Sequence, residues 1–127
     1  MNVAIVDYGV GNIKSIQHSL DRIGVNHTYT KDKEEIISAE KVIFPGVGDA
    51  SYAMKQLKKQ NLDKLIPNLK QPFLGICLGM QLLTKSSDEG VEKGLGWIDA
   101  QTVKFSITKE QYSIPHIITS AIEHPCV

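Results

Sequence analysis

Four short stretches rich in apolar and β-branched residues recur in the first part of the chain. They lie at residues 3–6, 25–30, 41–44 and 72–76. Short runs of this kind, bounded by glycine, proline or polar residues, are typical of the strands of a buried sheet. The pattern therefore predicts four strands.

The segments between these stretches carry apolar residues at helical spacing. In the first segment the apolar positions are three, four and three residues apart: Ile13, Ile16, Leu20 and Ile23. This spacing places them on one face of a helix, and Gly24 is a typical residue just beyond a helix end. We also expect a short helix at residues 34–39 and a longer one through Met54 and Leu57.

Strand, glycine-rich turn and helix thus follow one another three times with short links. This order predicts an α/β fold with a doubly wound, mostly parallel sheet. The character changes after a polar loop at residues 86–90. Beyond it we expect antiparallel strands at residues 94–98 and 102–105 and an extended piece at 113–118. We interpret residues 1–127 as a single domain.

The composition is that of an ordinary soluble protein. Of the 127 residues 42% are hydrophobic, and 14 lysines and arginines balance 14 aspartates and glutamates. This balance gives no basic surface for nucleic acid or an anionic membrane. The N-terminus lacks the basic region of a secretion signal, and Cys77 and Cys126 form neither a disulfide framework nor a zinc motif. We therefore expect a cytoplasmic protein with no metal, no cofactor, and no nucleic-acid or membrane partner.

The most informative stretch surrounds Cys77. An apolar strand runs into Gly75, the cysteine follows two positions later, and Gly79 and Gln81 come soon after it. Small residues on both sides let the chain turn sharply between strand and helix, which exposes the cysteine as a nucleophile. The start of the following helix would favour the thiolate. A buried structural cysteine is the alternative, but it does not explain the spacing of the glycines and the glutamine.

Two glycine-rich turns follow other strands, at residues 7–12 and 45–49. In a parallel sheet the carboxyl ends of the strands meet at one edge, so both turns should lie near the cysteine. Alternating Gly46 and Gly48 would let backbone N–H groups face a ligand closely, and with the N–H of Leu78 they would form an oxyanion hole.

Both turns also have a simpler interpretation. Glycines of this kind occur in any tight connection between a strand and a helix, and spacing alone does not decide between the two roles. Gly9 and Gly11 also begin a dinucleotide-binding pattern. Its third glycine and the acidic residue after the second strand are missing, which disfavours nucleotide binding.

These motifs together resemble those of class I glutamine amidotransferases, and among them the glutaminase subunits of imidazole glycerol phosphate synthase. The matching segments are residues 7–13, 44–48, 75–81, 94–98 and 114–116. The cysteine segment is typical of the whole superfamily, whereas the first and fourth segments resemble this subunit in particular. The resemblance implies a flavodoxin-like core, here with incomplete C-terminal strands.

The resemblance also implies a reaction and its residues. Cys77 would attack the side-chain amide of L-glutamine, form a thioester and release ammonia. The implied site residues are Val47, Gly48 and Leu78 in the oxyanion region, Gly46, Gly48 and Gln81 at the substrate, and Tyr8, Gly9, Gly11 and Asn12 facing a partner. That partner would be the cyclase subunit, a TIM barrel that takes the ammonia away from water.

The chain departs from the family pattern near its C-terminus. The catalytic histidine and glutamate of the family lie in a Phe-His-Pro-Glu-like segment that this chain does not reach, so we interpret it as C-terminally truncated. His124 and Pro125 are similar to part of that segment, but Cys126 stands where the glutamate would be. The pair also follows Cys77 far too soon, and we interpret the likeness as coincidence.

The remaining histidines are poor substitutes for the missing base. By topology His18 and His27 should lie away from the cysteine, which leaves His116 as the plausible neighbour. Without a base, nothing protonates the leaving ammonia or activates water. We therefore expect little or no glutamine turnover by the chain alone, and uncovered apolar surface that favours association.

Three other interpretations stay open. One is a non-catalytic homologue that keeps the fold and the partner-facing surface. Another is an ammonia donor to a different synthase, because few partner-facing residues can be judged. The third is another cysteine-dependent flavodoxin-like protein with His116 as its base, although Gln81 and Val47 fit glutamine better than a peroxide.

Overall fold

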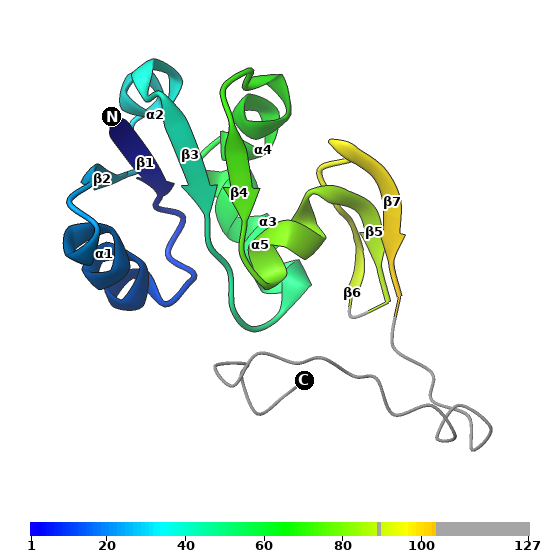
Figure 1. The fold of residues 1–127 in the computed structure, drawn as a ribbon. Coiled ribbons are helices and arrows are strands. Elements are labelled where there is room, and N and C mark those ends of the chain that lie inside the picture. Colours follow the sequence, from blue (N-terminus) through cyan, green and yellow to red (C-terminus); the bar gives the residue numbers. More distant parts are fainter. Residues whose placement is uncertain (89, 104–127) are drawn as a thin grey trace, which may run out of the picture.

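The centre of the fold is a four-stranded sheet, seen in a computed structural model that describes residues 1–88 and 90–103. The strand order is β2 (Asn26–Thr30), β1 (Asn2–Val6), β3 (Lys41–Phe44) and β4 (Phe73–Gly75). All neighbouring strands are parallel (Figure 1). The predicted parallel sheet is confirmed, and each strand end lies within one residue of its predicted position.

Helices cover both faces of this sheet, as expected for a doubly wound fold. Helix α1 (Ile13–Arg22) packs on one face against side chains of β1 and β3, chiefly Val3, Ile5 and Ile43. The larger core lies on the other face and takes in Ala4 and Val6, because successive side chains of a strand point to opposite faces.

The larger core is completed by side chains from the remaining helices. These are α2 (Lys33–Ser38), α3 (Ala50–Lys59), α4 (Leu62–Leu65), a 3-10 helix η1 (Ile66–Asn68) and α5 (Leu78–Leu82). The predicted helices correspond to α1, α2, α3 and α5 and are confirmed. The short α4 and η1 were missing from the prediction, because four and three residues are too few to show a helical period.

Local signals in the sequence set the helix ends. Gly24 has a φ of +69°, and the N–H groups of Gly24 and Val25 donate to the carbonyls of Asp21 and Leu20. This is the Schellman ending that the glycine predicts for α1. At the start of α2, the carboxylate of Asp32 accepts two backbone N–H groups of the first turn.

A small second sheet follows α5. Its order is β6 (Gly90–Lys93), β5 (Thr84–Ser87) and β7 (Ile98–Thr102). Strand β5 pairs antiparallel with β6 but parallel with β7. Two predictions were wrong here: residues 86–90 are not one polar loop, and residues 94–97 connect β6 to β7 instead of forming an antiparallel strand.

The polar character of β5 explains the first of these errors. Its sequence, Thr-Lys-Ser-Ser, has no apolar alternation, so only its pairing partners reveal it as a strand. The hydroxyl of Thr84 donates to the carbonyl oxygen of Gln81 in α5 at 2.6 Å, and it lies 3.1 Å from the hydroxyl of Thr102 in β7. The pieces expected at 102–105 and 113–118 lie, beyond residue 103, outside the described residues.

Within the part of the chain that the structure describes, the sheet face that carries α1 is covered only in part. Beside α1, over β3 and β4, lies an apolar hollow of about 240 Å³, whose lining includes Met1, Ile23, Val25 and Leu74. Leu74 is 56% exposed although it belongs to β4. Among the helices of the described residues, none has the length and apolar character needed to cross a membrane.

Candidate active site

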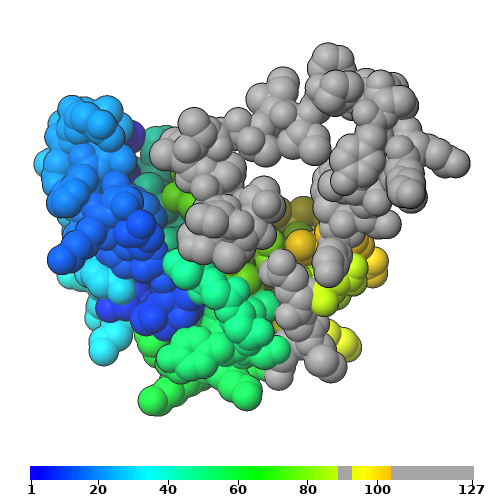
Figure 2. Space-filling model, turned by 90° about the horizontal axis from the view of Figure 1, so that it is seen from below, coloured from blue at the N-terminus to red at the C-terminus, as the bar shows by residue number. Residues whose placement is uncertain are grey.

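The carboxyl ends of β1, β3 and β4 bring three segments to one edge of the sheet. They are residues 7–12 after β1, residues 45–49 after β3, and Cys77 after β4. Figure 2 views the molecule from this edge, where the blue N-terminal segment adjoins the green segment after β3. The prediction that these segments share one edge is confirmed.

Cys77 occupies a turn with unusual backbone geometry. Its φ of +53° and ψ of −122° lie in a region that glycine adopts readily and that strains other residues. The residue caps the start of α5, and its carbonyl accepts the N–H of Met80 at 3.0 Å. The thiol side chain is exposed. The predicted sharp turn with an accessible cysteine is therefore present.

Close packing of backbone segments explains the glycines around this turn. A Cβ atom at Gly75 would lie 2.7 Å from the Cα atom of Met80, and one at Gly79 would overlap the carbonyl oxygen of Phe44. The N–H of Ile76 donates to that same carbonyl at 3.0 Å. These contacts fix the cysteine turn against the end of β3.

The turn after β3 lies directly against the start of α5. Gly46 is buried, and a Cβ atom there would overlap the N–H of Gly79 and come within 2.9 Å of Leu78. Val47 is 46% exposed, and Gly48 is exposed with a φ of +87°. The structure thus brings the two predicted halves of the oxyanion region together through the Gly46 contact.

Gln81 lies on α5, one turn beyond the cysteine. Its side-chain oxygen Oε1 is buried and, within the described residues, accepts no hydrogen bond. Burying an acceptor without a donor costs about 1–3 kcal/mol, so such a group is a candidate for contact with a ligand donor.

The turn after β1 requires one correction. Tyr8 was expected to face a partner, but its side chain is fully buried and its hydroxyl donates to the carbonyl of Pro45 at 2.6 Å. The exposed residues of this turn are Gly9 and Asn12, and Gly11 packs against the ring of Pro45. A tyrosine hydroxyl can be buried wherever it finds an acceptor, which the motif alone does not reveal.

A tyrosine that the sequence analysis missed lies at the same edge. The hydroxyl of Tyr29, near the end of β2, donates to Oδ1 of Asp7 at 2.6 Å, and burial together with this hydrogen bond raises the pKa of Tyr29 to about 12. Burial, and then the neighbouring Cys77 and Tyr29, raise the pKa of the Tyr8 hydroxyl as well. Both hydroxyls are therefore protonated donors at neutral pH. The one available signal was that Tyr29 and Asp7 end adjacent strands.

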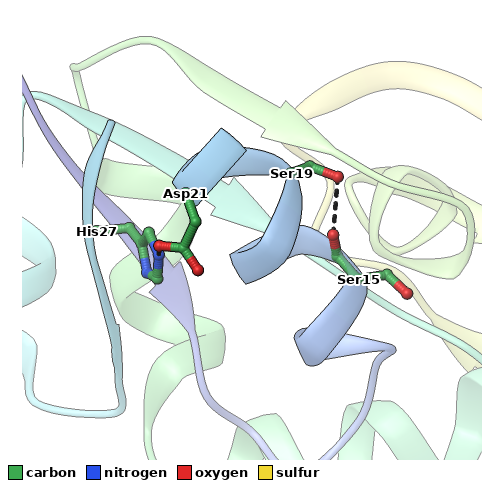
Figure 3. Close-up of polar contacts among 4 residues, drawn as sticks. All are labelled: Ser15, Ser19, Asp21 and His27. Atoms are coloured by element: carbon green, nitrogen blue, oxygen red, sulfur yellow. Dashed lines mark hydrogen bonds and ion pairs between the residues drawn. The ribbon is translucent and has the colours of Figure 1, made fainter. Parts of the chain in front are cut away.

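The described histidines do not belong to this edge, as predicted. His27 pairs in register with Val3 near the start of β1, and its Nε2 atom lies 3.0 Å from Oδ1 of Asp21 (Figure 3). His18 is exposed on α1. His116 and His124 lie outside the described residues. Among the residues described, no three His, Cys, Asp or Glu side chains come together as a metal site.

Comparisons with known proteins agree with this geometry. Residues 4–125 match the model of the family described as glutamine amidotransferase class-I. The chain is 48% identical to the imidazole glycerol phosphate synthase subunit HisH of Bacteroides thetaiotaomicron, over 92% of this chain and 60% of that protein. Identity is 47% to subunit HisH 2 of Methanococcus maripaludis, over 91% of this chain and 58% of the relative.

A third relative has a lower identity. Subunit HisH 2 of Pseudomonas aeruginosa is 39% identical, over 97% of this chain and 64% of the relative. The chain therefore spans about 60% of the length of the curated relatives that it matches. The family match covers nearly all of this chain. The protein belongs to the class I glutamine amidotransferase family.

Proposed function

We propose that the protein is the glutaminase subunit of imidazole glycerol phosphate synthase, which hydrolyses L-glutamine to glutamate and supplies ammonia to the cyclase subunit in histidine biosynthesis. The observation that carries the proposal is Cys77, exposed on a strained turn that packs against Gly46. The names of the relatives support the choice of this synthase.

The reaction begins at the thiol of Cys77. Its sulfur attacks the side-chain amide carbon of glutamine, and the amide oxygen becomes an oxyanion. Collapse breaks the C–N bond, ammonia leaves with the proton that the thiol gave up, and a thioester remains. Water then hydrolyses the thioester, which releases glutamate and restores the thiol.

The oxyanion needs donors that are already in position. We assign this role to backbone N–H groups of Val47, Gly48 and Leu78, because the Gly46 contact brings the first segment against the start of α5. Donors fixed before the reaction stabilise the developing charge more than donors that must reorient, and one such donor contributes about 100- to 1,000-fold in rate.

The substrate would lie between Gly46, Gly48 and Gln81. The Oε1 atom of Gln81, which has no hydrogen-bond partner among the described residues, offers an acceptor for an N–H group of the bound amino acid. This acceptor supports glutamine over a ligand without donors.

The partner-facing surface is assigned to the exposed residues Gly9 and Asn12, together with Gly11 beside them. They follow β1 at the same edge that holds Cys77. A TIM-barrel cyclase bound there would receive ammonia close to where it forms.

The test measures ammonia release from L-glutamine by the chain, alone and with the cyclase subunit. We expect slow release by the chain alone, because neither His18 nor His27 lies at the reactive edge. Any release should vanish in Cys77→Ala and persist in the matched variant Cys126→Ala, which removes the other cysteine. Release that survives Cys77→Ala would contradict the proposal.

Cyclase binding separates the proposal from its alternative. A chain that binds the cyclase but whose Cys77 reacts with no glutamine analogue would be a non-catalytic relative. A chain that releases ammonia without binding the cyclase would serve a different synthase.

A further inference from the structure

Two contacts from the turn after β1 meet on a single residue, Pro45. The hydroxyl of Tyr8 donates to the Pro45 carbonyl at 2.6 Å across 37 positions of sequence, in a buried environment. Gly11 lies so near the Pro45 ring that an added Cβ atom would come within 2.9 Å of its Cβ atom. Pro45 itself is fully buried.

Pro45 is the residue from which the oxyanion segment departs. Gly46 follows directly and lies against the peptide between Leu78 and Gly79. A peptide group is planar, so fixing the Pro45 carbonyl also fixes the direction of the Gly46 N–H. Beyond that point Gly46 and Gly48 give the backbone unusual freedom, which makes the fixed end important.

Contacts on both its ring and its hydroxyl fix the side chain of Tyr8 in place. Its ring packs against the ring of Phe44, with centroids 5.2 Å apart, and Phe44 ends the strand that leads into Pro45. The Pro45 carbonyl is a buried acceptor that needs a donor, and Tyr8 supplies it. Burial keeps the hydroxyl protonated, since it raises the pKa of Tyr8.

We propose that Tyr8 is a positioning residue for amide cleavage: its hydrogen bond to the Pro45 carbonyl sets the backbone of residues 46–48 against Leu78, where the oxyanion forms. This inference rests on the proposed function. Tyr8 does not touch the substrate and acts through Pro45.

The test compares two reagents on the full chain. A chloromethyl ketone analogue of glutamine forms a C–S bond to Cys77 and releases chloride, and its carbonyl oxygen occupies the oxyanion region during attack. Iodoacetamide alkylates the same thiol, releasing iodide, by displacement at a carbon that needs no oxyanion. Rates at Cys77 are followed by mass spectrometry for both reagents.

The variant is Tyr8→Phe, which keeps the ring and removes only the hydroxyl. We expect its rate with the glutamine analogue to fall about tenfold, because small displacements of reacting groups cost factors of this order. The rate with iodoacetamide should stay within about twofold of the native chain. Tyr52→Phe is the matched control: it removes the hydroxyl of an exposed tyrosine on α3, and it should leave both rates unchanged.

Each outcome has a separate meaning. If Tyr8→Phe leaves the ratio of the rate with the glutamine analogue to the rate with iodoacetamide unchanged, the positioning role is overturned and the proposed function stays intact. Equal loss with both reagents, with a lowered melting temperature, also overturns it, because the role is then structural. Chloroacetone is a chloromethyl ketone without the amino-acid part of glutamine. If the native chain reacts no faster with the glutamine analogue than with chloroacetone, the proposed function is overturned, and this inference with it.

Discussion

The backbone of Cys77 has a positive φ, a conformation that glycine adopts more easily than any residue with a side chain. Such strain persists only where surrounding contacts hold it, and here the hydrogen bond from Ile76 to Phe44 and the packing of Gly79 do so. The gain is an exposed thiol beside the start of α5. Strain at this position is therefore part of how the proposed nucleophile is exposed.

Two substitutions that both remove the thiol measure this strain. Cys77→Gly should be more stable than Cys77→Ala by about 1 kcal/mol, because glycine relieves the positive φ by more than it costs in chain entropy. Urea unfolding of both variants gives the difference. Equal stability, or a more stable alanine variant, would show that the turn is not strained in solution.

Residues with local signals were predictable, and those with distant partners were not. Glycines flanking a cysteine indicate a sharp turn in any context, so the place of Cys77 followed from its neighbours. The burial of Tyr8 depends on Pro45, which lies far along the chain and comes close only because β1 and β3 are adjacent. The pairing of Tyr29 with Asp7 depends in the same way on β1 and β2.

At the scale of elements, α5 and β3 meet backbone to backbone. Gly79 has no room for a side chain, because the carbonyl oxygen of Phe44 occupies the place of its Cβ atom. This contact brings the start of α5 next to the turn after β3. The distance between those two elements therefore determines the geometry of the proposed oxyanion region.

Gly79→Ala should separate these elements. We expect a loss of about 3 kcal/mol in the free energy of unfolding, because the new methyl group meets backbone that cannot rotate away. Reaction of Cys77 with a glutamine analogue should slow as well. The control is Gly24→Ala, at a positive φ with nothing within 4 Å of the added Cβ, which should cost only about 1 kcal/mol.

Chemical denaturation of both variants provides the comparison. A Gly79→Ala chain as stable as the Gly24→Ala chain would mean that α5 shifts freely on the sheet. The contact would then have no influence on the site.

Elements with strong apolar patterns were predictable from the sequence. The strands and helices up to α3 combine such a pattern with clear end signals, such as Gly24 and Asp32. The second sheet has polar strands whose pairing is decided by the chain around them, so its order and direction could not be predicted.

At the scale of the whole molecule, the exposed apolar face beside α1 affects how the chain associates with other molecules. The hollow over β3 and β4 is lined almost wholly by apolar side chains, and Leu74 and Ile23 are among the most exposed of them. Contiguous apolar surface of this kind favours association in water.

Leu74→Lys should therefore weaken self-association of the chain, by about tenfold in the dissociation constant if burial of one leucine is lost. Sedimentation velocity over a concentration series measures it. Tyr52→Lys is a matched control, since Tyr52 is also 56% exposed but lies on α3. Equal effects of both substitutions would indicate that added charge, and not the apolar face, governs association.

The order of the four strands also determines which parts of the sheet open first. Strands β1 and β3 are paired on both sides, whereas β4 pairs only with β3 within the described residues. Amide hydrogens of central strands exchange with solvent only through large openings, while an edge strand can detach in a small fluctuation. The candidate nucleophile is attached to such an edge strand. Brief detachment of β4 would therefore move Cys77 away from Gly46 while the rest of the sheet stays closed, and the reactive arrangement could be lost and regained without unfolding.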